Sequence, residues 1–236
     1  MKKYWKWIFI GVLAILLLCN LICLFHLARH NLDKDLNKLN LDKVDSLMIV
    51  AHPDDETLWG GAHLNEDNYL VVCITCGKNR WRYHEIKAVT KMSNNSFVGL
   101  YYPDKTLFTI NNWHRSYDSI QKDVEKIVKM KKWKQIVTHN KQGEYGHIHH
   151  KKTHKIVTDV YENLKLQDKV KLYYFGDYYS NKKIKLLTKD DYLMSDVDFL
   201  KKEKMIKKYK SQYFVTKKFK HMNRHENFQE YNEETR

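Results

Sequence analysis

Proline and glycine are scarce in this chain, with two prolines and eight glycines among 236 residues. Because these residues mark most turns and linkers, their scarcity leaves little room for a second linker between domains. No internal repeat is visible. The length beyond residue 43 suits one compact domain with a sizeable core, which we expect over residues 44–213.

Cysteine is also rare, with four in the chain. Cys73 and Cys76 lie in the apolar stretch 69–76, which predicts a buried strand. Residues three apart on a strand point to opposite faces, so we expect no disulfide between them. A redox or zinc-binding Cys-x-x-Cys normally lies in a loop or at a helix start, so these cysteines are predicted to be packing residues.

Acidic residues are outnumbered, 28 against 42 lysines and arginines, which gives a net charge of +14. Lysine runs occupy residues 129–134, 151–155, 182–185 and 201–210. This pattern favours solvated helix faces. The alternative is attraction to an anionic partner, such as a phosphate-containing lipid head group or an acidic cell-wall polymer. Nothing resembles a recognition helix or an RNA-binding sheet motif, so no nucleic-acid partner is expected.

One long apolar run stands out at residues 8–27, with no formal charge. Twenty residues at a rise of 1.5 Å each span a bilayer core, and Trp5 and Trp7 precede the run as interfacial residues do. The run is longer than the apolar part of a typical signal peptide, and no small-x-small cleavage site follows it. We therefore predict an uncleaved N-terminal transmembrane helix.

The charges beside this run favour one orientation. Lys2, Lys3 and Lys6 crowd its N-terminal side, whereas the basic residues after it are interspersed with aspartates. The positive-inside rule then predicts a single-pass protein of the cell membrane, with a cytoplasmic N-terminus and an extracytoplasmic catalytic domain. Residues 1–27 would be the flank and anchor, residues 28–43 a polar linker, and residues 214–236 a polar C-terminal tail.

Strand and helix patterns alternate through the rest of the chain. We expect strands at 46–51, 69–75, 97–101, 135–138 and 169–175, and helices at 82–92, 116–130, 149–164 and 196–213. This alternation predicts right-handed β-α-β units around a mostly parallel sheet. The expected fold class is α/β, a Rossmann-like three-layer α/β/α domain.

The polar turn 51–56, Ala-His-Pro-Asp-Asp-Glu, directly follows the first expected strand. Ligands in open α/β folds bind at this carboxyl edge of the sheet. His52 and Asp55 supply an imidazole and a carboxylate, which a catalytic zinc ion accepts as ligands, and Asp54 is left over as a base. The alternative is that the acidic residues only complement the dipole at a helix start.

A histidine cluster follows the expected strand 135–138. Five histidines fall within residues 138–154, and two of them, His147 and His150, lie three apart at the expected start of a helix and therefore on one face. Since both clusters follow strands of the same sheet, they are expected to meet at one edge, which favours metal binding or catalysis.

The His-Pro-Asp-Asp-Glu turn, with Gly-x-x-Gly-His-x-x-His after a later strand, resembles the LmbE-like/PIG-L family of zinc-dependent de-N-acetylases. The resemblance covers about residues 46–212. It implies a zinc ion, or another divalent first-row metal, on His52, Asp55 and His150.

The same resemblance implies catalytic roles. Asp54 would be the general base, and His147 a protonated histidine that stabilises the oxyanion or protonates the leaving amine. Arg80 and Glu144 are predicted to contact substrate. His149 occupies a slot where relatives usually carry a different polar residue, which leaves open an exchange of roles between His149 and His150.

The predicted activity is that of a membrane-anchored, metal-dependent amidohydrolase. Its substrate would be the acetamide of an N-acetylglucosaminyl group on a glycolipid or cell-surface glycan. Two alternatives remain open: a small-molecule amidase of thiol or antibiotic metabolism, and a non-catalytic basic module, tethered to the membrane, that binds anionic polymers. The sequence predicts no oligomeric state.

Overall fold

The computed structural model describes residues 2–29, 32–77, 79–106, 109–186 and 194–236, without the side chains of residues 2, 3 and 21–29. The chain divides into two compact units, Met1–Asn37 and Lys38–Arg236.

The first unit consists of helices α1 (Lys2–Arg29) and α2 (Leu32–Leu36). Within the part of the chain that the structure describes, no helix has both the length and the apolar character needed to cross a membrane. The predicted transmembrane anchor, and the membrane location derived from it, are therefore not supported. Described side chains of α1 cover residues 4–20, fewer than the about 20 apolar residues that a span requires, and the rest of the predicted span lies outside them.

The second unit is built on a sheet of six strands in the order β3-β2-β1-β6-β7-β8. Neighbours among the first five run parallel, and β8 pairs antiparallel with β7 at the edge. The strands are β1 (Ser46–Val50), β2 (Tyr69–Cys73), β3 (Ser96–Gly99), β6 (Gln135–Thr138), β7 (Lys171–Phe175) and β8 (Phe228–Glu230). A small antiparallel pair, β4 (Lys105–Thr106) and β5 (Thr109–Ile110), lies outside this sheet.

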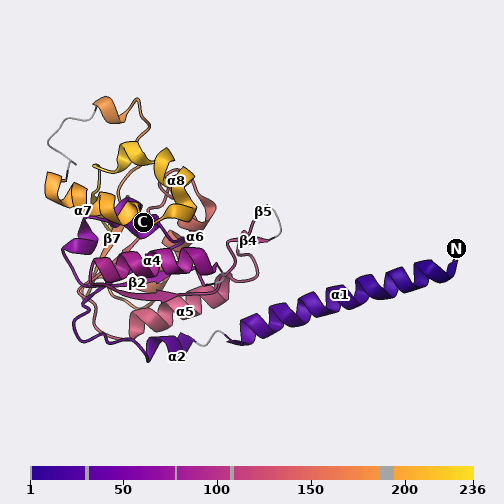
Figure 1. The fold of residues 1–236 in the computed structure, drawn as a ribbon. Coiled ribbons are helices and arrows are strands. Elements are labelled where there is room, and N and C mark those ends of the chain that lie inside the picture. Colours follow the sequence, from indigo (N-terminus) through magenta and orange to yellow (C-terminus); the bar gives the residue numbers. More distant parts are fainter. Residues whose placement is uncertain (1, 30–31, 78, 107–108, 187–193) are drawn as a thin grey trace. The chain divides into compact units, whose positions relative to one another are not determined.

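Helices cover both faces of the sheet, and Figure 1 shows α4 and α5 on opposite sides of it. The helices of the second unit are α3 (Asp55–Gly60), α4 (Arg80–Met92), α5 (Tyr117–Lys129), α6 (Ile148–Asn163), α7 (Asp196–Ile206) and α8 (Tyr213–Lys218). Short 3₁₀ turns occupy His63–Asn65, Ile184–Leu186, Lys210–Gln212 and Lys220–Met222. The predicted α/β class with a mostly parallel sheet is confirmed.

The sequence patterns account for these elements. Every residue of β1 and β2 is buried, as expected for central strands of a parallel sheet covered on both faces. Cys73 and Cys76 are buried and free, which confirms their prediction as packing residues. Helix α5 buries one stripe at helical spacing: Ile120, Val124, Ile127 and Val128.

The strand order fixes the position of a ligand site. β1 and β6 are neighbours in the sheet, yet the chain leaves β1 toward β2 and leaves β6 toward β7, in opposite directions. Such a point opens a crevice at the carboxyl ends of the two strands. Both predicted motifs follow these two strands, so the topology brings them together.

The last predicted helix, residues 196–213, is broken in the structure. Helix α7 ends at Ile206, and Tyr209 turns inward, where it is buried and donates its hydroxyl proton to Glu56. The residues after 213 also belong to the compact unit, since Phe219 and Met222 are buried and β8 extends the sheet. The unit is therefore wider than the predicted domain 44–213.

A buried ion pair attaches the C-terminal segment to α3. Lys202 donates to the carbonyl of Leu58 at 2.8 Å and to Glu226 at 2.7 Å. Glu226 also accepts from the backbone N–H of Ala62 at 2.9 Å and from His63 Nδ1 at 2.7 Å. Both charged side chains are almost fully buried. Burial by itself would raise the pKa of Glu226, but Lys202 and His63 outweigh it and lower that pKa to about 2.

Removing one member of this pair is expected to be strongly destabilising, because the other charge stays buried without a partner. We expect Lys202→Met and Glu226→Gln each to lower the free energy of unfolding by about 3–5 kcal/mol. The double variant should lose less than the sum of the two. Urea unfolding measures this, with the exposed Lys201→Met as control, and a loss below about 1 kcal/mol in both single variants would contradict the prediction.

Candidate metal centre

The turn between β1 and α3 carries the first motif in a strained conformation. Asp54 has φ 111°, in the left-handed region that residues with a side chain rarely adopt. Its backbone N–H donates to Glu56 at 3.1 Å, and Glu56 also accepts from Thr57 and Tyr209. Strain of this kind persists where surrounding bonds enforce it, and it concentrates at functional sites.

The three predicted metal ligands converge on one point. His52 Nδ1 lies 3.2 Å from His150 Nε2 and 3.2 Å from Asp55 Oδ2, and the last two atoms are 3.3 Å apart. All three residues are buried. Two ligands of a tetrahedral zinc ion, each about 2.0–2.1 Å from it, lie about 3.3–3.4 Å apart. The near-equilateral triangle therefore fits one small metal ion.

Glu144 orients one of these ligands. It accepts a hydrogen bond from His150 Nδ1, so that the Nε2 lone pair of His150 faces the triangle. This carboxylate–histidine pairing is common behind metal sites. Burial would lower the pKa of His150, but Asp55 and Glu144 outweigh it and raise that pKa to about 10. A metal ion that binds Nε2 therefore has to displace a proton from it. The side chain of Glu144 is fully buried, so its prediction as a substrate contact is not supported.

His139 also lies at the site, although its role was not predicted from the sequence. Its Nε2 lies 3.4 Å from Asp55 Oδ2, close enough to be considered as a ligand. However, that nitrogen accepts from the Ala51 N–H at 3.0 Å, and Nδ1 bonds Glu144 at 3.0 Å. Its lone pair is thus already used, and His139 supports the site. Its place directly after β6 was the available signal.

Asp54 lies beside the triangle with an unused oxygen. Among the described residues, its buried Oδ2 has no hydrogen-bond partner, and Oδ1 lies 3.7 Å from Arg82 Nη2. Burial, followed by repulsion from Asp55, raises its pKa well above the usual aspartate value. A metal site that only stabilised the fold would be closed by four ligands, so an unpartnered carboxylate here suits a proton acceptor.

The arginine at the site is Arg82, not the predicted Arg80. Arg80 is exposed at the start of α4. Arg82 donates to the Pro53 carbonyl at 3.0 Å and to Asp104 at 3.1 Å. The two arginines are two positions apart on α4, so they point in different directions, and the sequence did not distinguish them.

His147 caps α6, and its Nδ1 accepts from the His149 N–H at 3.2 Å. Burial and then the neighbouring His52 and His150 lower its pKa to about 3. This low pKa favours the neutral form of His147 at pH 7, in contrast to the protonated form that the resemblance implied. With Nδ1 occupied, Nε2 carries the proton and is the available donor.

His149 and His150 lie at different places relative to the triangle. His150 Nε2 faces Asp55, whereas His149 Nδ1 lies 2.9 Å from the opposite nitrogen of His52, Nε2. The geometry supports His150 as the ligand and places His149 behind His52.

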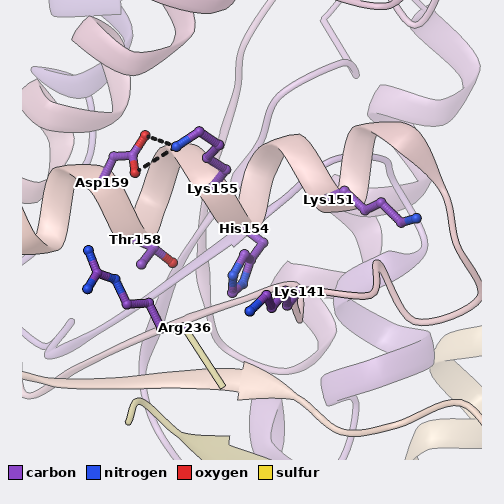
Figure 2. A pocket seen from close by; sticks show the side chains of 7 residues that line it. All are labelled: Lys141, Lys151, His154, Lys155, Thr158, Asp159 and Arg236. Carbon is purple, nitrogen blue, oxygen red and sulfur yellow. Dashed lines mark hydrogen bonds and ion pairs between the residues drawn. The ribbon is translucent and has the colours of Figure 1, made fainter. Parts of the chain in front are cut away.

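A basic hollow of about 370 Å³ lies beside α6, and its lining includes Lys141, His154 and Arg236. Figure 2 shows Lys155 directed at Asp159, with two bonds of 3.0 and 3.1 Å within the helix. His154 bonds the backbone carbonyl of His139 at 3.0 Å and is not a metal ligand. At this run the structure agrees with a solvated, self-paired helix face.

A buried triangle of two histidines and one aspartate lies beside an unpartnered carboxylate, at the carboxyl edge of a parallel sheet. Catalytic zinc sites in hydrolases use ligands of these types. Residues 47–161 match the family model PIG-L, described as GlcNAc-PI de-N-acetylase. This segment contains both motifs, and its match to the PIG-L model confirms the resemblance seen in the sequence.

Two further similarities were found. The chain is 32% identical over 138 residues to the uncharacterized protein L374 of Acanthamoeba polyphaga mimivirus, and the match covers 50% of this chain and 58% of that protein. Among solved structures, it is similar to GalB, the 4-carboxy-2-hydroxymuconate hydratase of Pseudomonas putida KT2440, with a TM-score of 0.48 and 15% identity. That match covers 75% of this chain and 83% of the hydratase.

The bond between Glu144 and His150 predicts a measurable effect on metal affinity. Glu144→Gln keeps the size of the side chain but removes the negative charge behind His150. We expect zinc affinity about 10–100-fold weaker, with the stoichiometry unchanged. Competition with a chromophoric chelator measures the zinc affinity. Glu162→Gln, on the same helix as His150, serves as control. Unchanged affinity in Glu144→Gln would show that the pairing does not support a metal ligand.

Proposed function

We propose that this protein is a zinc-dependent de-N-acetylase that hydrolyses the acetamide of an N-acetylglucosaminyl group on a glycolipid or cell-surface glycan. The observation that carries the proposal is the unpartnered Asp54 Oδ2 beside the triangle of His52, Asp55 and His150. The PIG-L match supports the reaction class.

The residues account for each proton in the reaction. A zinc ion held by the triangle would polarise the acetyl carbonyl and acidify a water molecule. Asp54 takes a proton from the attacking water, whose oxygen bonds to the acetyl carbon. The C–N bond then breaks, and protonated Asp54 returns the proton to the leaving nitrogen, giving an amine and acetic acid, which ionises to acetate at neutral pH. The raised pKa of Asp54 suits both steps.

His147 supplies a neutral donor to the same reaction. Its Nε2–H can donate a hydrogen bond to the oxygen that becomes negative as the carbonyl is attacked. At other oxyanion sites, loss of one such donor lowers kcat by about 10²–10³-fold. Because its pKa of about 3 keeps it neutral, it does not act as the acid for the amine. That role stays with Asp54.

The sugar is proposed from the family description and from the rim of the site. Asp104 is partly exposed and is held by Arg82, so the two present a charged pair beside the centre. Such polar groups can bond sugar hydroxyls. A small-molecule amide substrate would use the same centre, and only assays distinguish the two. The unpartnered Asp54 disfavours a non-catalytic binding module.

The proposal predicts that activity and metal binding separate at Asp54. The full chain, loaded with zinc, should release acetate from N-acetylglucosaminyl lipids or oligosaccharides. Asp54→Asn should reduce release at least about 10³-fold while it still binds one zinc ion, since it removes the base but no ligand. The exposed Arg80→Gln is the matched control and should remain active. Acetate release by Asp54→Asn at the wild-type rate would contradict the assignment of Asp54 as the general base.

The pH profile gives an independent check on Asp54. Activity requires its carboxylate form, so the rate falls as the pH drops through its pKa. Arg82 lowers that pKa, and Arg82→Gln should therefore raise it and move the acid limb of kcat/KM to higher pH. Arg80→Gln should leave the limb in place. A limb that stays fixed or moves to lower pH in Arg82→Gln would contradict this assignment.

A further inference from the structure

We propose that His149 is a positioning residue that fixes the tautomer of His52, so that the Nδ1 lone pair of His52 points into the metal triangle. The inference rests on the proposed metal site. His149 is the middle member of a chain of three hydrogen-bonding groups: the Asn111 carbonyl, His149 and His52.

The first link defines the state of His149. Its Nε2 is hydrogen-bonded to the backbone carbonyl of Asn111. A carbonyl oxygen can only accept, so Nε2 must carry the proton. A neutral imidazole has a single N–H, and Nδ1 of His149 is therefore an acceptor.

The second link transmits that choice to His52. His149 Nδ1 lies 2.9 Å from His52 Nε2, an ordinary hydrogen-bond distance. Because His149 accepts, His52 must donate from Nε2. The lone pair of His52 then resides on Nδ1, the atom that lies 3.2 Å from both Asp55 and His150. The alternative tautomer would place a proton inside the triangle.

The surroundings hold His149 in this position. Trp113 stacks on its ring, with centroids 4.1 Å apart and an angle of 3° between the planes. Trp113 is itself fully buried, adopts φ 55° and donates its indole N–H to the Pro103 carbonyl at 2.7 Å. The segment that follows β5 thus supplies both the carbonyl and the stacking surface.

A second metal ion is the competing explanation, since His52 Nε2, His149 Nδ1 and Asp104 Oδ1 also lie near one another. Their separations are uneven, at 2.9 Å between the two nitrogens and 3.6 and 3.7 Å to the carboxylate. Nitrogens sharing a tetrahedral zinc ion lie about 3.3 Å apart, so 2.9 Å favours a shared proton.

Two substitutions distinguish the effect of the hydrogen-bond acceptor of His149 from the effect of its ring. His149→Phe keeps a ring to stack on Trp113 but removes the acceptor. His149→Asn removes the ring but retains an oxygen near the place of Nδ1. We expect zinc affinity to fall about 10–100-fold in His149→Phe and to recover most of this loss in His149→Asn, measured by chelator competition on full-length protein.

The outcomes decide between the explanations. Unchanged affinity in His149→Phe, or equal loss in both variants, would overturn the proposal, because the acceptor would not matter. Two zinc ions per chain, reduced to one by both His149→Phe and Asp104→Asn, would overturn it in favour of the second metal. Affinity is measured without substrate, so a failure of the proposed deacetylase activity would not be confused with a failure here.

A measurement on the wild-type protein does not depend on how the variants fold. In zinc-loaded protein labelled with ¹⁵N-histidine, His52 should show a proton on Nε2 and zinc on Nδ1. Zinc on Nε2 of His52, or no proton on that nitrogen, would overturn the proposal.

Discussion

The burial of three consecutive carboxyl groups in one turn is the constraint on which the rest of this structure depends. Asp54, Asp55 and Glu56 are all nearly inaccessible to solvent. Burial would raise the pKa of Asp55, but His150 and its other histidine neighbours hold that pKa well below the usual range. Burial raises the pKa of Glu56 to about 7 and that of Asp54 well above its ordinary value. The neighbours of these three carboxyl groups thus set their pKa values apart, which suits the proposed roles of a charged ligand, a structural acceptor and a base.

Support for this turn comes largely from residues beyond the matched segment 47–161. Tyr209 is hydrogen-bonded to Glu56. Lys202 donates to the backbone carbonyl of Leu58 in α3, and its partner Glu226 accepts from the backbone N–H of Ala62. Ser211 bonds Glu85 on α4 at 2.7 Å. The C-terminal third of the chain is therefore part of the apparatus that holds the candidate site.

The clustered histidines differ in what their second nitrogen contacts. His150 is backed by Glu144, which leaves Nε2 for a metal, whereas His139 has both nitrogens occupied by the protein. His147 keeps Nε2 as an available donor. His149, in our proposal, accepts a hydrogen bond from His52 and thereby fixes the tautomer of His52. Four similar side chains thus take different roles, because a neutral imidazole has one proton and its partners decide which nitrogen carries it.

The sequence by itself determined the fold class, the turn after β1, the histidine cluster after β6 and the candidate ligands His52, Asp55 and His150. Hydrophobic periodicity and local motifs are properties of neighbouring residues, so they can be seen before folding. Tertiary structure decided which arginine reaches the site, that Glu144 lies behind His150, that burial lowers the pKa of His147, and that the C-terminal segment completes the sheet. These depend on burial and on contacts between residues distant in sequence, such as Tyr209 with Glu56 or Asn111 with His149, which no local pattern contains.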